Sequence, residues 1–465
     1  MRHEEKNVCK ECHDTGLNCA DGRRCAELRK HEYREYDGIR LTADGFDCAL
    51  PMTIDSHSVC AYECLYCFAN NLPGHQTQWE KPVGRTSIKT LESIFSGRGE
   101  SVTARTYRKA LKYDRRNAAG FPCPVQIGGL CDPCDSIEQN DGWLLDFINL
   151  AIKYNQPVRM STKGAIFLIP EYLKAIEKAP HLFWVAFSII TNDDGLAERI
   201  ERNAPNTSTR LKAMKALGDI GVKTSLRLRP MIPGVTDKNK GYKELIARAA
   251  DAKAGATSYE SMFYPTGMPK DKALQWNRFL LHVGIDLKKI YAGFGKMQAC
   301  TRPAYTWTEA IMHSVRDEAH KHGMTVGVSD PVWKQLSDVG CCCGIKPDDP
   351  VFGNWERENA TNALITARDS ANKLISLSAI VPPWANEVKL GNMVNMGAGP
   401  LVVHDKRHMT WEDHLYYTWN NPSVQRSAMN YFQGAIRPHE KDADGNWVYK
   451  YVGLERQNIP SIWNI

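Results

Sequence analysis

The sequence predicts an α/β fold: a parallel β/α barrel, complete or partial, of the TIM type, with an added segment at each end. Short β-rich runs alternate with amphipathic helical stretches from about residue 48 to 330. Such alternation is typical of right-handed βαβ units. The length of 465 residues accommodates one large barrel with additions.

The expected elements follow each other regularly along the barrel region. The strands are expected at 49–54, 125–129, 157–161, 183–188, 222–229, 256–263 and 324–329, and helices between them at 143–153, 170–178, 207–217, 242–253 and 307–321. Six or seven such units favour a barrel over a sandwich.

The run 222–229 indicates which side chains face inward. Leucines at 226 and 228 alternate with Arg227 and Arg229. In a barrel the outer strand face packs on apolar helices, so the leucines are expected outside and the arginines in the lumen. The alternative is a strand rim with solvated arginines.

The two ends of the chain differ from the middle. Residues 1–45 are polar and contain C-x2-C-x6-C-x5-C, formed by Cys9, Cys12, Cys19 and Cys25. Four thiolates predict a closed metal site with a stapling role, either zinc or a second iron–sulfur cluster. Residues 46–335 form the predicted barrel. Residues 336–465 form an accessory segment, expected to be irregular, because the stretch from 351 holds 6 of the 12 tryptophans.

Composition excludes several classes of protein. With 43% apolar and 24% charged residues, the chain is not mainly disordered. It has no apolar run of 18 residues and begins with a charged segment, so neither a membrane span nor a signal peptide is expected. Its 15 cysteines are clustered, which favours metal or iron–sulfur ligation in a reducing cytoplasm over secreted disulfides. The net charge of +6 only permits a polyanionic partner.

One cysteine triplet directly follows the first expected strand. Cys60, Cys64 and Cys67 have the spacing C-x3-C-x2-C. Three thiolates on one loop suit three corners of a 4Fe–4S cluster and leave the fourth iron open to a small chelating molecule. Tyr66 is placed to cover that molecule. A zinc loop with its fourth ligand elsewhere is the alternative.

At this point the chain resembles the radical S-adenosylmethionine (SAM) superfamily, specifically its spore photoproduct lyase-like branch. The resemblance begins with the run 60–71 (CAYECLYCFANN). Further matches follow in order: Gly128-Gly129 with Asp132-Pro133, Ser161-Thr162-Lys163, Phe187-Ser188, Asn203-Ala204-Pro205, and Arg229-Pro230 with Pro233-Gly234.

Most of these matches fall at the expected carboxyl ends of strands, the catalytic face of such barrels. The resemblance implies that Gly128 and Gly129 let the backbone approach the methionyl amine of SAM. Ser161 and Lys163, and likewise Ser188, are expected to hold its ribose or carboxylate. Arg227 or Arg229 is expected to pair with a carboxylate or a phosphate instead. A turn or cap role is the alternative for each residue taken alone.

The resemblance also implies a reaction and a substrate. The 4Fe–4S cluster passes one electron into SAM, and the resulting 5′-deoxyadenosyl radical abstracts hydrogen from the substrate. An electron donor such as a flavodoxin or ferredoxin is implied. The substrate is expected to be a thymine-derived base in DNA, undergoing photoproduct cleavage (a lyase) or rearrangement of a modified pyrimidine (an isomerase). The alternative is a radical SAM enzyme acting on a peptide or small metabolite.

Cys131 and Cys134 follow the second expected strand. Spore photoproduct lyases use a cysteine in this neighbourhood as a hydrogen donor, so both are candidate catalytic residues. The alternative is a small buried side chain. For Cys341, Cys342 and Cys343 metal binding and an active-site position both stay open.

A basic stretch at 104–117 is expected to be a helix with six basic residues on one side. We interpret this side of the helix as a face that contacts successive phosphates of a nucleic acid. A solvated surface helix is the alternative.

Overall fold

The architecture is that of a computed structural model that describes most of the chain. The described residues are 33–42, 48, 50, 52–71, 83–99, 102–111, 117–265, 270–291, 296–297, 300–353, 359–382, 384–390, 393–395, 399–400, 408–424, 427–432 and 434–453. Cys9, Cys12, Cys19 and Cys25 lie outside these ranges, so the N-terminal metal site stays a prediction, as do the domain boundaries.

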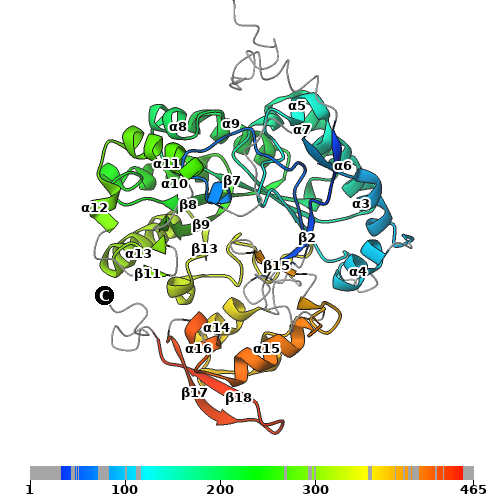
Figure 1. Ribbon diagram of the computed structural model, residues 1–465, viewed down its shortest axis with the longest axis vertical. Coiled ribbons are helices and arrows are strands. Elements are labelled where there is room, and N and C mark those ends of the chain that lie inside the picture. The colour runs from blue at the N-terminus through cyan, green and yellow to red at the C-terminus, as the bar shows by residue number, and fades with distance from the viewer. Residues whose placement is uncertain are drawn as a thin grey trace, which may run out of the picture.

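A mostly parallel sheet forms the centre of a mixed α/β fold (Figure 1). Its strands, in spatial order, are β13 (Thr325–Val328), β9 (Ala254–Ser261), β8 (Lys223–Met231), β7 (Phe183–Ser188), β6 (Val158–Thr162), β5 (Val125–Ile127), β3 (Met52–Ile54), β2 (Ile39–Thr42), β15 (Met393–Asn395) and β16 (Gly399–Pro400). From β3 to β13 all neighbours are parallel, whereas β2 is antiparallel to β3. Within the described residues the end strands β13 and β16 do not pair, so the sheet is open there.

Helices surround this sheet in Figure 1. Those between successive parallel strands are α5 (Glu138–Asp141), α6 (Trp143–Lys153), α7 (Pro170–Glu177), α8 (Asp194–Ile200), α9 (Thr207–Asp219), α10 (Gly241–Asp251), α11 (Lys270–Val283), α12 (Leu287–Tyr291) and α13 (Tyr305–Lys321), preceded by α3 (Ile88–Phe95) and α4 (Val102–Ala110). All seven expected strands and all five expected helices are present, with their ends shifted by at most a few residues. Within the described residues no helix is both long and apolar enough to cross a membrane.

The main sheet has two chemically different faces. Leu226 and Leu228 of β8 are fully buried in the main hydrophobic cluster, which includes residues of α9 and α10. Arg227 lies between them and donates to the hydroxyl of Ser161 on β6, two strands away. The expected alternation is confirmed. We call the arginine-bearing side of the sheet its inner face.

The C-terminal segment is not irregular, so that prediction is wrong. It contains α14 (Ala360–Asp369), α15 (Trp411–Asn420), α16 (Ala428–Tyr431) and an antiparallel sheet of β14 (Leu374–Ile375), β18 (Trp447–Tyr451) and β17 (Ile436–Lys441). Trp419 is fully buried, with its ring centroid 4.8 Å from that of Tyr449. The aromatic residues therefore pack as part of the main hydrophobic cluster.

Two small sheets complete the fold. β1 (Arg34–Tyr36) pairs with β4 (Gly84–Thr86), and β12 (Cys300–Thr301) lies between β10 (Tyr264–Pro265) and β11 (Lys296–Met297). The first sheet lies beside the chain leaving β3, since Ser58 N–H donates to the carbonyl of Gly84.

Candidate functional site

The cysteine triplet lies on a loop that leaves the carboxyl end of β3. Four contacts from elements far along the chain hold the loop backbone. They are Ala61 N–H to Asp135 (2.7 Å), Leu65 N–H to the Ile200 carbonyl (2.9 Å), Asn203 Nδ2 to the Ala61 carbonyl (2.8 Å) and Gln275 Nε2 to the Cys64 carbonyl (3.1 Å). The loop is therefore fixed before any ligand binds.

The three cysteines of the loop are at least partly buried. Cys64 is buried, Cys60 and Cys67 are half-buried, and none of them forms a disulfide. Within the described residues no group of three histidine, cysteine or acidic side chains is arranged to hold one metal ion. A cluster suits this spacing, because each thiolate binds a different iron. Burial raises the pKa of Cys60 and Cys64, so a cationic partner is needed to make them thiolates.

Tyr66 belongs to a buried charged cluster beside this loop. Its hydroxyl donates to Glu201, and its ring lies 5.4 Å from Lys163 Nζ. Glu201 also pairs with Lys163 (3.1 Å) and with the fully buried Arg210 (2.6 Å). Although burial opposes ionisation, Arg210 and Lys163 lower the pKa of Glu201 to about 2. Tyr66 and Lys163 are thus rigidly placed next to the cysteines.

Gly128 and Gly129 form a close turn after β5. Gly128 has φ +83°, and a Cβ there would lie 2.2 Å from the Ser161 carbonyl, so no other residue fits. Asp55, one residue beyond β3, accepts from the N–H groups of Gly129 (3.1 Å) and Leu130 (2.7 Å). The turn therefore lies near the start of the cysteine loop.

The other predicted cofactor residues lie on neighbouring strands. Ser188 ends β7 and is half-buried. Ser161, inside β6, accepts hydrogen bonds from Arg227 and from the buried Arg159. Arg229 donates to Glu260 (2.6 Å). The structure thus brings Ser161 to the arginines, whereas Lys163 pairs with Glu201 beside the loop.

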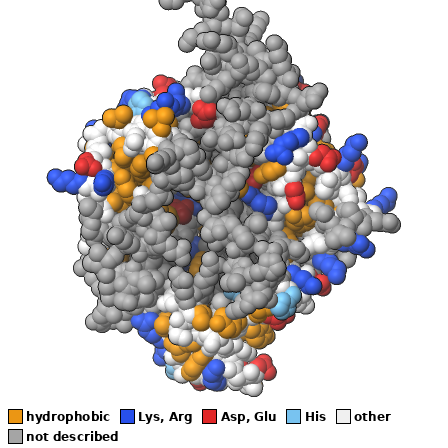
Figure 2. Space-filling model, in the orientation of Figure 1, with side chains coloured by type: hydrophobic (Ala, Val, Ile, Leu, Met, Phe, Trp, Pro, Cys, Tyr) orange, Lys and Arg blue, Asp and Glu red, His pale blue; other side chains and the backbone are white. Residues whose placement is uncertain are grey.

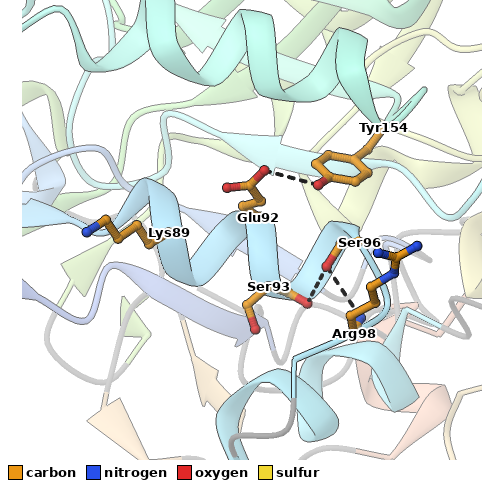
Figure 3. A pocket seen from close by; sticks show the side chains of 6 residues that line it. All are labelled: Lys89, Glu92, Ser93, Ser96, Arg98 and Tyr154. Carbon is orange, nitrogen blue, oxygen red and sulfur yellow. Dashed lines mark hydrogen bonds between the residues drawn. The ribbon is translucent and has the colours of Figure 1, made fainter.

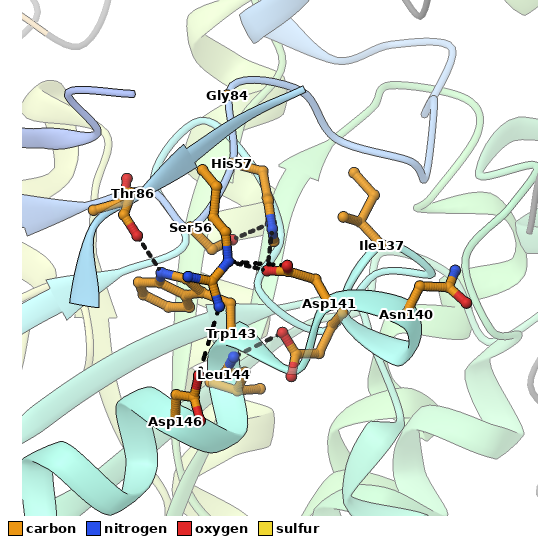
Figure 4. Close-up of polar contacts among 12 residues, drawn as sticks. Ser56, His57, Gly84, Thr86, Ile137, Asn140, Asp141, Trp143, Leu144 and Asp146 are labelled. Carbon is orange, nitrogen blue, oxygen red and sulfur yellow. Dashed lines mark hydrogen bonds and ion pairs between the residues drawn. The ribbon is translucent and has the colours of Figure 1, made fainter. Parts of the chain in front are cut away.

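Cys131 ends a buried hydrogen-bond chain, of which Figure 4 shows Ser56, His57 and Asp141. Its Sγ lies 3.3 Å from Ser56 Oγ, which is 3.1 Å from His57 Nδ1. His57 Nε2 lies 3.0 Å from Asp141, which also accepts from Arg85 (2.7 Å). Burial lowers the pKa of His57 and raises that of Cys131. Cys131 is therefore a neutral thiol that retains its hydrogen.

Cys134 and Cys342 are placed differently from each other. Cys134 lies in the main hydrophobic cluster, with its Sγ 3.9 Å from Met160 Sδ, and its carbonyl accepts from Tyr62 of the cysteine loop (2.5 Å), so its catalytic role stays a prediction. Cys342 Sγ accepts from Arg229 at 3.6 Å, so this cysteine of the 341–343 run reaches the inner face.

The pocket in Figure 3 lies elsewhere. It has a volume of about 470 Å³ and is lined by Lys89, Glu92, Ser93, Ser96, Arg98 and Tyr154. These residues lie on or next to α3 and α6, and none of the predicted site residues is among them.

α4 covers the first part of the basic stretch and is followed by Leu111 in a turn, which corrects the expected unbroken helix over 104–117. α4 ends at Ala110, and residues 112–116 lie outside the described ranges. Arg108 donates to the carbonyls of Gly97 and Gly99, so it stabilises the end of α3. Arg105 and Lys109 are exposed. Lys109 also lies 3.7 Å from Glu387, so Arg105 is the more accessible of the two for a partner.

Arg159, Glu201 and His57 are among the residues described above that sequence reasoning missed. Arg159 precedes Ser161 by two positions, so the alternation rule used for 222–229 would have found it. Glu201 and His57 carry no such signal, because their partners come from distant segments.

Comparisons with known proteins give partial matches. No protein-family model matches the chain. Uncharacterized proteins of Mycobacterium tuberculosis and Mycobacterium bovis are 24% identical over 213 residues, 45% of this chain and 58% of theirs. The chain thus matches little more than half the length of these curated relatives.

Two kinds of solved structure are similar to the chain. Spore photoproduct lyase complexed with dinucleoside spore photoproduct has a TM-score of 0.46 and 16% identity, over 63% of this chain and 80% of that one. Streptococcus suis SuiB bound to precursor peptide SuiA has a TM-score of 0.32 and 16% identity, over 52% and 43%. The first name agrees with the resemblance found in the sequence. At these TM-scores the overlap is loose, and the function proposed below rests on the chain's own residues.

Proposed function

We propose that the chain is a radical SAM enzyme in which Cys60, Cys64 and Cys67 hold a 4Fe–4S cluster. The observation that carries this proposal is the C-x3-C-x2-C loop at the carboxyl end of β3, the first parallel strand. The loop backbone is held by contacts from distant segments, and Tyr66 within it is hydrogen-bonded to Glu201. When bound, the cluster and SAM supply one-electron chemistry that leads to hydrogen abstraction.

The protein's own residues bind and orient. Gly128 and Gly129 offer a close backbone approach, and Ser188 offers a polar group at a strand end. The hydrogen bond and the ion pair formed by Glu201 hold Tyr66 and Lys163 in one arrangement. Burial around the loop excludes water from the reacting groups.

The proposed substrate is a thymine-derived base in DNA. The order of motifs between 60 and 234 supports this choice, and the buried neutral thiol of Cys131 suits a hydrogen donor. The reaction is then photoproduct cleavage or rearrangement of a modified pyrimidine, with a flavodoxin or ferredoxin as electron donor.

The first test replaces the cysteines. Cys60→Ala, Cys64→Ala and Cys67→Ala should each abolish 5′-deoxyadenosine formation from SAM and dithionite in anaerobically reconstituted protein, with the circular-dichroism spectrum unchanged. Cys48→Ala is the matched control, because Cys48 is a half-buried cysteine outside the loop. If the triple alanine variant still yields 5′-deoxyadenosine, the radical SAM proposal is wrong.

The substrate needs a separate experiment. Anaerobic incubation with deuterated DNA should transfer deuterium into 5′-deoxyadenosine. Transfer from deuterated peptides or metabolites, with none from DNA, would contradict the DNA substrate and leave the radical SAM assignment intact.

A further inference from the structure

Two arginines from separate strands converge on the inner face of the sheet. Arg159 is the second residue of β6 and Arg227 the fifth of β8, with β7 between them. Both nevertheless donate to the single hydroxyl of Ser161. The two guanidinium groups therefore share one location.

Positive charge is in excess at this location. Glu260 pairs with the neighbouring Arg229. In the part of the chain that the structure describes, Arg159 and Arg227 form no ion pair with a carboxylate. Burial, together with the charges of Arg229 and Arg159, lowers the pKa of Arg227 to about 9. An anion bound here would offset this repulsion.

Several donors at this location have no acceptor. Arg159 Nε, Arg227 Nε and Ser258 Oγ lack hydrogen-bond partners among the described residues. Arg159 is 5% exposed and Ser258 0%, so water does not readily replace a partner. Ser258 lies opposite Arg227 on the adjacent β9. Leaving a buried donor unsatisfied is unfavourable, and more so for a charged group.

We propose that Arg159, Arg227 and Ser258 form a binding site for an oxyanion, a carboxylate or phosphate group carried by the substrate. Guanidinium groups recognise such planar or tetrahedral oxyanions through paired N–H donors. The assignment to the substrate rests on the proposed function. The proposal adds one feature that the proposed function does not specify: the substrate carries an anionic group that enters the inner face of the sheet.

The site lies next to the residues assigned to SAM. Gly128, Gly129 and Lys163 lie beyond the last residues of β5 and β6. The two arginines meet at Ser161, two residues before Lys163, which is about 7 Å along an extended strand. Because Ser161 is already engaged by both arginines, we assign the anion to the substrate rather than to SAM, and the second experiment below tests this choice.

The first experiment measures anion binding without cofactor. Isothermal titration of the full chain with inorganic phosphate and, separately, with acetate at constant ionic strength should show saturable binding of at least one of them. Arg227→Met should weaken it at least tenfold. Ser258→Ala, a smaller change that keeps the charges, should weaken it about threefold or more. Arg248→Met is the control, because Arg248 bonds to Asn192 and Ser208 away from the inner face.

Two outcomes overturn the anion site. One is the absence of saturable binding of both probes. The other is equal binding by the wild type, Arg227→Met and Ser258→Ala. Preferred binding of phosphate or of acetate identifies which oxyanion the substrate carries.

The second experiment separates substrate from cofactor. Equilibrium dialysis of reconstituted protein with SAM should show an Arg227→Met effect several-fold smaller than the effect on the anion probe. Equal losses would assign the arginines to the SAM carboxylate and overturn the proposal. Anion binding in a wild type that forms no 5′-deoxyadenosine would instead refute the proposed function while the anion site stands.

Discussion

Single buried charges show how this chain stabilises its candidate site. Glu201 is fully buried and accepts from Tyr66 while pairing with Lys163 and Arg210. One carboxylate thereby balances two cations directly beside the cysteine loop. A buried charge is tolerated only with such partners, so each member depends on the others.

We predict that Glu201→Gln destabilises the protein by about 3–5 kcal/mol, because the buried Arg210 and the half-buried Lys163 lose their counter-charge. Urea unfolding at pH 7 measures this difference. Glu198→Gln is the control, because Glu198 is exposed on the same helix, and it should change the free energy of unfolding by no more than about 0.5 kcal/mol.

The same residue predicts a pH dependence. The folded-state pKa of Glu201 is lowered from 4.5 to about 2, so its contribution is complete above pH 4.5 and is lost as the pH falls toward 2. The difference between wild type and Glu201→Gln should therefore shrink over that window. A difference that stays constant down to pH 2 would contradict the assigned ion pairs.

At the scale of elements, periodicity made the parallel core predictable. α6 and β7 have the bounds expected from the sequence, because their apolar spacing records which face is buried. The Gly128-Gly129 turn and the cysteine loop were also found, since each depends on local residue types. Contacts between distant segments were not, as Glu201 and His57 show. The C-terminal helices were missed because aromatic content was taken to indicate irregular structure.

We predict that Gly128→Ala destabilises the protein more than Gly221→Ala does. Both glycines have positive φ, +83° and +88°, but no described atom lies within 4 Å of a Cβ at 221. Gly221→Ala thus incurs only backbone strain, about 1–2 kcal/mol. Gly128→Ala adds a collision with the Ser161 carbonyl and should cost at least about 1 kcal/mol more by urea unfolding. Equal losses in the free energy of unfolding for the two variants would show that β6 shifts to accommodate the added methyl group, and that the close approach of β5 and β6 is not required.

At the scale of the whole molecule, surface charge decides between the proposed partners. Figure 2 shows Lys and Arg side chains on the rim of the molecule near α3 and α4. The exposed Arg105 and Lys109 of α4 belong to this region, whereas Arg108 donates to the backbone carbonyl of Gly97. Nucleic acid bound along such a rim releases counterions, which makes its affinity depend on salt.

We predict that reversing Arg105, Lys112 and Arg115 to glutamate weakens DNA binding regardless of sequence. If each residue contacts one phosphate, the slope of log affinity against log salt should flatten by about 2.7 for duplex and about 2.1 for single-stranded DNA. Lys174, Lys178 and Arg199 reversed together are the control, because they are exposed on or directly after other helices and change the net charge equally. Their reversal should alter the slope much less. An unchanged slope in the first variant would make the basic stretch a solvated face and would favour a peptide or metabolite substrate.

Because the target base must leave the stack to reach the strand ends, at a cost of a few kcal/mol, single-stranded DNA should be a better substrate than duplex DNA.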